Sequence, residues 1–211
     1  MIVHRSFQHG WFYHFRYHTH KTDLLCTQSL LPLKCYFESV KQYLPEEPFL
    51  SGPRSSQLKL DLKIKPEEIT HHEVCALAKL GLELADYKTS HSNVECFMLH
   101  NDDKTVGVEV PIWVEAHEIS ANLPSYDGVF SSTDPLSGHI DIVRMENKKL
   151  WVWDYKPKAH LEKFASTQTF FYALMLSKRT GIPLDEFMCG YFDENKSFVF
   201  RPKIEMLRNL K

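Results

Sequence analysis

The sequence predicts an α/β domain, because segments with the alternation of strands and segments with the periodicity of helices follow one another along the chain. The 211 residues are 43% hydrophobic and 25% charged, a composition typical of a globular protein with a sizeable core. The central strand patterns occur at residues 105–114, 140–143, 150–155 and 187–192. One helix is expected at residues 72–87, before these strands, and another at residues 161–179, between the last two.

Residues 1–56 are expected to form an N-terminal extension, and residues 57–211 the main domain. Between Trp11 and His18 aromatic residues alternate with others, which predicts a strand. We expect this strand to pack on the core or on a partner, and the alternative is a stacking platform for unpaired bases. Zinc binding by the nearby histidines is a further alternative, although nothing in their spacing requires it. A short helix and then a linker rich in Pro, Gly and Ser are expected before residue 57.

Two further strands are predicted from short apolar segments before residue 105. Residues 57–64 contain the alternating stretch LKLDLKI, which is typical of a strand. Residues 95–99 contain the run ECFML, and a polar turn at residues 100–104 leads from it into the strand at residues 105–114.

Two acidic residues and one lysine belong to neighbouring predicted strands. Asp141 interrupts one apolar strand, and Asp154 and Lys156 lie at the end of the next, LWVWDY. Residues 146–149 between them are polar and predict a hairpin turn. Because side chains alternate along a strand, Asp154 and Lys156 share one face, and the hairpin can bring Asp141 beside them. The alternative for an isolated Asp-x-Lys triplet is a solvated strand end, but unpaired charges inside apolar strands are costly.

The carboxylates of Asp141 and Asp154, brought together in this way, repel each other unless a cation neutralises them. Hard oxygen ligands of this kind favour Mg²⁺ or Mn²⁺. A divalent ion can bind a phosphate oxygen and orient water, and the Lys156 ammonium can hold the attacking water or stabilise the developing charge. The three residues therefore predict a metal-dependent site for the hydrolysis of phosphodiesters.

The expected helix at residues 161–179 places Gln168 and Tyr172 on its inward-facing stripe, one turn apart. A Gln on a buried stripe needs a hydrogen-bond partner. We expect its amide either to bond to the backbone or to orient a site carboxylate, Lys156 or a nucleic-acid phosphate.

Three motifs together carry a resemblance to a known family: GHID at residues 138–141, WDYK at residues 153–156, and Gln-x-x-x-Tyr at residues 168–172. With this set, residues 70–192 resemble the PD-(D/E)XK nuclease superfamily, and most of all its RecB-like branch. The resemblance implies a restriction-endonuclease-like fold, with an α-β-β-β-α-β core in which helices flank a central mixed sheet. It also implies dependence on Mg²⁺ or Mn²⁺ and cleavage of DNA.

The same resemblance implies a role for each motif residue. Asp141 and Asp154 would be metal ligands, Lys156 the catalytic lysine, and Gln168 and Tyr172 would position the site and the nucleic acid. The sequence departs from the RecB-like pattern at Ile140, where Pro is common, and it has no cysteine cluster resembling the iron–sulfur ligands of some relatives.

Two further candidate ligands lie outside these motifs. The stretch VEVP around Glu109 resembles the preceding strand of the family, which often carries a carboxylate. Glu109 therefore either supports the metal or faces solvent on an edge strand. RecB-like relatives often have a His near the first core helix, which the helix at residues 72–87 resembles. Of the local candidates His71, His72 and Glu83, we favour His72.

The formal net charge of −2 is not typical of a protein that binds nucleic acid tightly, so a DNA partner needs a local basic lining around the acidic site. The expected partner is DNA, as single strands or duplex ends, and no membrane contact is expected, since no apolar run is long enough to span a bilayer. Five widely spaced cysteines, an odd number, favour a reducing, cytoplasmic compartment. The long loop at residues 118–137 is expected to border the substrate channel, and Lys203, Arg208 and Lys211 form a basic tail.

These observations predict a metal-dependent DNA nuclease, with exonuclease action on DNA ends or single strands in repair, recombination or replication as the expected mode. One alternative is a catalytically inactive module that keeps the fold for binding nucleic acid or for assembly. The other is an interaction protein whose acidic face docks a partner.

Overall fold

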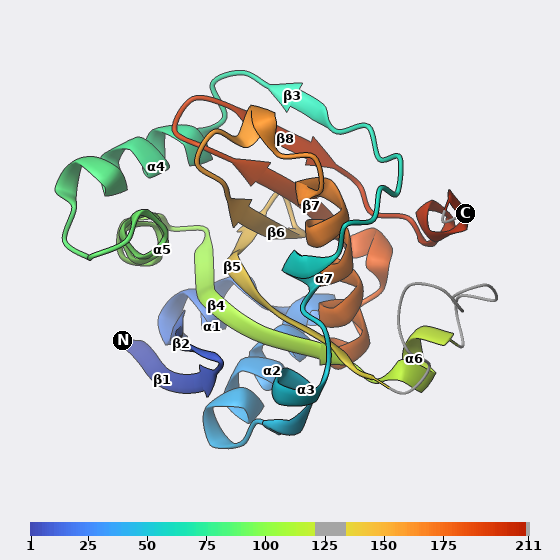
Figure 1. Cartoon of the computed structure of the whole chain (residues 1–211). Helices are drawn as coiled ribbons and strands as arrows, with labels where there is room; N and C mark the ends of the chain where they lie inside the picture. Colours follow the sequence, from blue (N-terminus) through green and yellow to red (C-terminus); the bar gives the residue numbers. More distant parts are fainter. Residues whose placement is uncertain (121–133, 210–211) are drawn as a thin grey trace.

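The computed structural model describes residues 1–120 and 134–209 of the chain (Figure 1). Most of the loop expected to border the substrate channel, at residues 118–137, therefore lies outside the described residues, as does Lys211 of the basic tail. The strands are β1 (Ile2–His9), β2 (Trp11–His18), β3 (Glu67–Ile69), β4 (Thr105–Val114), β5 (Leu136–Glu146), β6 (Lys149–Tyr155), β7 (Phe187–Phe192) and β8 (Ser197–Phe200). The helices are α1 (Thr19–Leu25), α2 (Leu31–Gln42), α3 (Glu47–Ser51), α4 (Glu73–Leu84), α5 (Ser90–Asn101), α6 (Ala116–Ser120) and α7 (Ala165–Thr180).

Within the described residues, eight strands form one sheet in the order β1-β2-β4-β5-β6-β7-β8-β3. β6 and β7 run parallel and are connected through α7, whereas the other neighbouring pairs are antiparallel. The succession α5-β4-β5-β6-α7-β7 is the predicted α-β-β-β-α-β core, so the predicted fold class is confirmed. The helix at residues 72–87, expected to be the first core helix, is α4, but α5 is the helix that leads directly into β4.

Helices cover both faces of the sheet: α4 and α5 lie on one face, and α2 and α7 on the other (Figure 1). Successive side chains of β6 pack on opposite faces of the sheet: Val152 packs on the α7 face and Trp153 on the α5 face. Trp153 is fully buried, and Gly190 on β7 leaves the space that its ring fills, because a Cβ there would collide with it. Burying such a side chain contributes about 2–3 kcal/mol. None of the described helices is long and apolar enough to cross a bilayer.

α7 begins later than predicted, at Ala165 instead of Leu161. Leu161 belongs to a separate turn of 3₁₀ helix (Ala159–Leu161) and is 63% exposed. The chain enters this turn through Lys158, which has a left-handed backbone (φ 63°), and this geometry separates the turn from the helix. The helix ends as predicted at Gly181, whose left-handed φ of 74° makes it a C-cap.

The strand predicted at residues 57–64 is wrong. Leu58 and Leu62 are buried, so the alternating pattern does mark inward-facing side chains. Among the described residues the segment nevertheless pairs with no strand: Lys63 has a left-handed φ of 55°, and the Leu62 N–H donates to Thr167 Oγ1 of α7 (3.4 Å). Alternation reports burial of every second side chain, which a coil packed on a helix also achieves. The strand in this region is β3, a few residues later.

The strand predicted at residues 95–99 is also wrong, because this segment is the second half of α5. The Thr89 side chain caps the helix by accepting from Ser92 N (3.1 Å). Val94 and Met98, one turn apart, are both buried, as a helix requires. The run ECFML has only four apolar residues, too few to separate a strand from a helix by periodicity, and the Thr89 cap upstream favours the helix.

The predicted strand between Trp11 and His18 is confirmed as β2. Phe15 and Tyr17 are buried against Phe37 of α2, so the inner half packs on the core as expected. β2 also pairs with β4, which joins the first 56 residues to the central sheet. The division of the chain at residue 57 stays a prediction about folding units, but the sheet and the core run across it.

Candidate active site

The middle of β5, the end of β6 and the residue that follows β6 bring the three central predicted residues together. The pairing of the two strands continues to Ile142 and Trp153, and Asp141 and Asp154 come next on each strand. The Tyr155 N–H donates to Asp141 Oδ2 (2.9 Å). Lys156 Nζ lies 2.7 Å from Asp154 Oδ2, forming an ion pair. Two acids and one ammonium therefore meet at one point, as the sequence predicted.

Gln168 and Tyr172 join this cluster from α7, and both are buried. The Gln168 side-chain amide donates to Asp154 Oδ1 (3.2 Å) and to the Tyr172 hydroxyl (2.7 Å). Of the two alternatives for this Gln, a backbone bond or a site carboxylate, the structure shows the carboxylate. The amide fixes the orientation of Asp154 from the side opposite Lys156.

Glu109 reaches the site through an irregularity in β4. Its backbone has a positive φ of 46°, which is rare for a residue with a Cβ and is often found at functional sites. On either side of it, Val108 packs with the α5 side of the sheet and Val110 with the α7 side, although strict alternation would place them together. The Glu109 carboxylate accepts a hydrogen bond from the His14 backbone N–H of β2. A strand of the N-terminal segment thus positions a carboxylate of the site.

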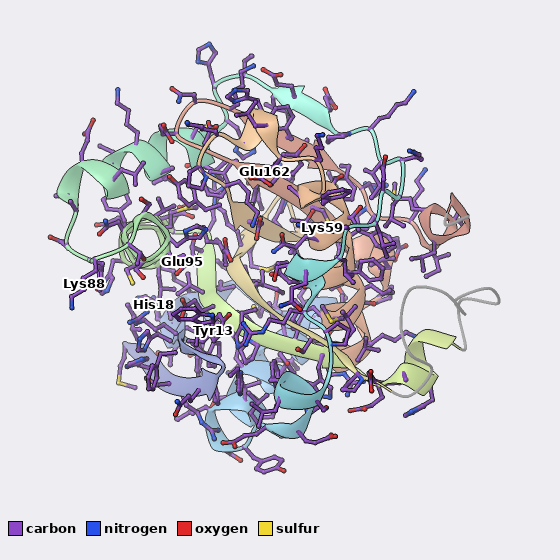
Figure 2. The ribbon with its side chains drawn as sticks, viewed as in Figure 1. Tyr13, His18, Lys59, Lys88, Glu95 and Glu162 are labelled. Carbon is purple, nitrogen blue, oxygen red and sulfur yellow. The ribbon has the colours of Figure 1, made fainter. Side chains whose placement is uncertain are left out.

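Two residues of α5, His91 and Glu95, line the same pocket and were missed from the sequence. Glu95 is 2% exposed, and Figure 2 labels it between α5 and the sheet. His91 Nε2 lies 4.0 Å from Asp141 Oδ2. Both residues are on one helix face because they are one turn apart. The spacing of four positions between His91 and Glu95 would have indicated a shared helix face. The prediction of a strand at residues 95–99 excluded that interpretation.

The N-terminal segment also contributes to the pocket, which has a volume of about 270 Å³. Tyr13 of β2, labelled in Figure 2, and Arg54, in the segment expected to be a linker, line it next to His139. The rings of Tyr13 and His139 stack at a centroid distance of 3.6 Å. No local sequence pattern indicates these residues, because Tyr13 is placed by the pairing of β2 with β4 and Arg54 by its pairing with Ser137 of β5.

His72, the favoured histidine, is not brought to this pocket. It caps α4 by accepting from Val74 N (3.3 Å), and its ring packs 5.0 Å from that of Trp153. Its nearest acidic partner is Glu146, 3.9 Å away at the hairpin end of β5. Glu146 is five positions further along β5 than Asp141, which places the two residues roughly 17 Å apart. The expectation that His72 is a metal ligand is therefore corrected, and His91 is the histidine beside the carboxylates.

Burial and charge set the protonation of the site. Burial raises the pKa of Asp154 to about 7 and that of Asp141 to about 6, although Lys156 opposes both shifts. Burial and the charges of Asp141 and Glu109 raise the pKa of Glu95 well above its usual value. Burial alone would lower the pKa of Lys156, but the carboxylates of Asp154 and Asp141 raise it. Below these pKa values the carboxyl groups hold protons, and a divalent cation competes with those protons for the oxygens.

The residues present fit Mg²⁺ or Mn²⁺ in the type of their donor atoms. Of the described residues, four carboxylates line the pocket: Glu95, Glu109, Asp141 and Asp154. Oε2 of Glu95 is buried and has no hydrogen-bond partner among the described atoms, which leaves an oxygen available as a ligand. Hard oxygens of this kind suit both ions. In the described part of the chain, no three His, Cys, Asp or Glu side chains are already gathered closely enough to enclose an ion, so binding requires the carboxylates to draw together.

Comparison with known protein families gives a match. The model of the PD-(D/E)XK nuclease superfamily matches residues 88–205, from just before α5 to beyond β8. The matched segment includes every carboxylate of the pocket together with His91, Lys156 and Gln168, whereas Tyr13 and Arg54 lie before it. No curated protein matches the chain.

Proposed function

Since the chain belongs to the PD-(D/E)XK nuclease superfamily, we propose that it is a metal-dependent nuclease that hydrolyses DNA phosphodiesters. The observation that carries the proposal is the meeting of Asp141, Asp154 and Lys156 in one pocket, with Gln168 bonded to Asp154. Hydrolysis of a phosphodiester needs a cation site, a positioned water and stabilisation of developing negative charge. The pocket has side chains suited to each of these tasks.

Asp141 and Asp154 would hold Mg²⁺ or Mn²⁺, with Glu95 or Glu109 as further oxygen ligands. When bound, the ion supplies charge that stabilises the attacked phosphate and lowers the pKa of bound water. Lys156 keeps its proton, because its pKa is raised, and its ammonium is 2.7 Å from Asp154 Oδ2. It therefore serves as a hydrogen-bond donor to the attacking water or the phosphate, and not as a base.

Three contacts with the protein keep the ligands in place. The Tyr155 N–H holds Asp141, the Gln168 amide holds Asp154, and the His14 N–H holds Glu109. Ligands fixed in this way lose little freedom when an ion or a phosphate arrives. Gln168 and Tyr172 are positioning residues in this scheme, because they act through Asp154.

We further propose exonuclease action on DNA ends or single strands, by the likeness of the GHID and WDYK motifs to the RecB-like branch. The cysteines are all in the described part of the chain and form no disulfide there, and four of them are buried. These free thiols support a reducing, intracellular compartment.

The test is degradation of end-labelled single-stranded and duplex DNA with Mg²⁺ or Mn²⁺, comparing the wild type with Lys156→Ala. The matched control is Lys158→Ala, which removes an exposed lysine two positions away. Loss of Lys156 is expected to lower the rate about 10²–10³-fold, the usual effect of removing one stabilising donor. The control is expected to remain active, and EDTA is expected to stop both enzymes. Equal rates for the wild type and Lys156→Ala would remove the assignment.

One observation favours a second candidate, a catalytically inactive nucleic-acid-binding or assembly module. Lys156 already neutralises Asp154, and the carboxylates of the described residues are not gathered as a ligand cluster. Calorimetric titration with Mn²⁺ separates the candidates, because the inactive module would bind DNA and show no metal binding. The nuclease is expected to bind Mn²⁺, and Asp154→Asn is expected to weaken that binding.

A further inference from the structure

A second hollow, of about 450 Å³, adjoins the catalytic pocket. It is lined by the turn between β1 and β2, by α3 and by the segment that follows α3, with His9, Gly10, Trp11, Phe49, Leu50 and Arg54 among its residues. Arg54 lines both hollows, so the two are neighbours. We call this second hollow the hairpin groove. A strand leaving the carboxylates past Arg54 would enter it directly.

The hairpin groove presents an aromatic ring to solvent. Trp11 is 78% exposed, although it stands on the same face of β2 as Tyr13, roughly 7 Å further along the strand. The other rings nearby are already stacked: Tyr13 on His139, and His9 on Phe49 at a centroid distance of 4.1 Å. Trp11, in contrast, keeps most of its own surface available to a flat ligand.

The charge of the groove suits a nucleic-acid strand. The Arg54 guanidinium lies 5.1 Å above the centre of the Tyr13 ring and donates to its hydroxyl, which holds the cation at the junction of the two hollows. The described residues that line the groove include no carboxylate, whereas four carboxylates line the catalytic pocket. A phosphodiester backbone is therefore repelled less along this route, and it meets a fixed positive charge on the way.

We propose that the hairpin groove binds one unpaired nucleotide of the DNA substrate, next to the phosphate that is cleaved. Trp11 stacks on its base, and Arg54 contacts its phosphate. The ring is next to the tip of a hairpin, where Gly10 adopts a left-handed φ of 79°, and the described residues leave it 78% exposed. This inference rests on the proposed nuclease function for its direction, since it places the groove beside the cleaved bond. It assigns to the exposed half of β2 a role that packing on the core does not explain.

Equilibrium binding tests the proposal without cleavage. The full chain is titrated in EDTA into a fluorescein-labelled oligothymidylate, and into matched oligonucleotides in which one nucleotide at a time is abasic. Trp11→Ala is expected to weaken binding about tenfold, the effect of losing one stacked base. Phe12→Ala is the matched control, because Phe12 is 67% exposed on the same strand but faces away from the groove, and it is expected to change binding less than twofold.

The abasic series shows whether the effect belongs to a base. One abasic position is expected to weaken binding by the wild type about tenfold and to have no further effect in Trp11→Ala. Arg54→Gln is expected to reduce the slope of log K against log [salt] by about 0.7, the value for one phosphate contact on a single strand, whereas Trp11→Ala leaves the slope unchanged. Thermal midpoints within a degree of the wild type confirm that the variants are folded.

Two results would contradict the proposed role of the hairpin groove. One is an equal loss of affinity in Trp11→Ala and Phe12→Ala, and the other is a loss of affinity in Trp11→Ala that is the same with and without the base. Failure of the nuclease assignment is visible separately. If added Mn²⁺ produces no cleavage but the variants and abasic oligonucleotides bind as expected, the nucleotide-binding role of the groove is supported and the nuclease proposal is contradicted.

Discussion

The side-chain amide of Gln168 donates to Oδ1 of Asp154 across 3.2 Å, and this bond ties α7 to the end of β6. Asp154 is fully buried, so its oxygens depend on protein partners: Gln168 for Oδ1, and Lys156 for Oδ2. A buried carboxylate that loses a donor becomes harder to ionise. Gln168 therefore bears on both the orientation and the charge of a proposed metal ligand.

Gln168→Leu is expected to lower the DNA cleavage rate about 10- to 100-fold, because a lost bond to a buried charged group costs about 1.5–3 kcal/mol. Tyr172→Phe is the comparison, since it removes the acceptor hydroxyl and leaves the bond from Gln168 to Asp154 in place. It is expected to cost less than tenfold. Steady-state rates at saturating Mn²⁺ measure both, and a larger loss for Tyr172→Phe would contradict the order of these contacts.

Metal affinity is expected to rise between pH 6 and pH 8. The pKa of Asp141 is about 6 and that of Asp154 about 7, and an ion binds the deprotonated carboxylates. Each proton displaced in this range strengthens binding by up to about tenfold per pH unit. Calorimetry with Mn²⁺ at three pH values measures the slope, with the exposed Glu83→Gln as a control that keeps the wild-type slope. Affinity that does not change with pH would mean that neither carboxylate is a ligand.

Gly138→Ala is expected to destabilise the fold by about 1–3 kcal/mol and to lower activity, because the new Cβ has no room. It would lie 2.6 Å from Tyr172 Cε1 and 2.7 Å from Ser55 Oγ, so the Tyr172 ring has to move. Urea unfolding measures the free energy. Ser137→Ala, one residue earlier on β5, is the control: it removes a buried hydroxyl that has no partner among the described atoms. Equal free energies of unfolding for the two variants would show that the Tyr172 ring moves aside without a measurable cost.

Because of His9, the free energy of unfolding is expected to decrease as the pH is lowered through the acid range. Burial and the charge of Arg54 lower its pKa to about 4, whereas the unfolded chain has the ordinary value of 6.5. Between these values the unfolded chain takes up a proton that the folded chain does not. Stability present above pH 6.5 is therefore lost as the pH falls toward 4, by up to about 1.4 kcal/mol per pH unit.

The measurement is urea unfolding at pH 7.0 and pH 5.5 for the wild type and His9→Phe, which keeps a ring stacked on Phe49. The variant is expected to lose less stability than the wild type between the two pH values. His160→Phe, at an exposed position, is the control and is expected to follow the wild type. A pH dependence unchanged by His9→Phe would place the titrating group elsewhere.

The residues that the structure brings together as expected are those whose neighbours are fixed by local geometry. Asp141, Asp154 and Lys156 follow from strand alternation and one short hairpin, and Gln168 follows from a single turn of helix. Glu109 was left open because alternation assumes regular backbone, and its positive φ breaks that assumption. The sequence pattern contains no direct sign of such a conformation at a Glu.

The missed residues depend on contacts between distant segments. Glu95 and His91 enter the site only if α5 is a helix, and a short apolar run could not establish that. Tyr13 reaches it because β2 pairs with β4, at least ninety positions away in the chain, and Arg54 reaches it because Arg54 pairs with Ser137 of β5. His72 was favoured only because related proteins often have a His near the first core helix, and its ring packs instead against the indole of Trp153.

The pairing of β2 with β4 also governs how the protein can be shortened. Lys21 donates to the carbonyls of Leu99 (2.6 Å) and Asp102 (2.5 Å) at the end of α5, so the first residues also restrain the helix that carries Glu95. A chain trimmed to residues 57–211 would expose β4 as an unprotected edge, inviting self-association. Anyone preparing the minimal catalytic fragment should therefore expect insoluble material, and should keep the first 56 residues attached.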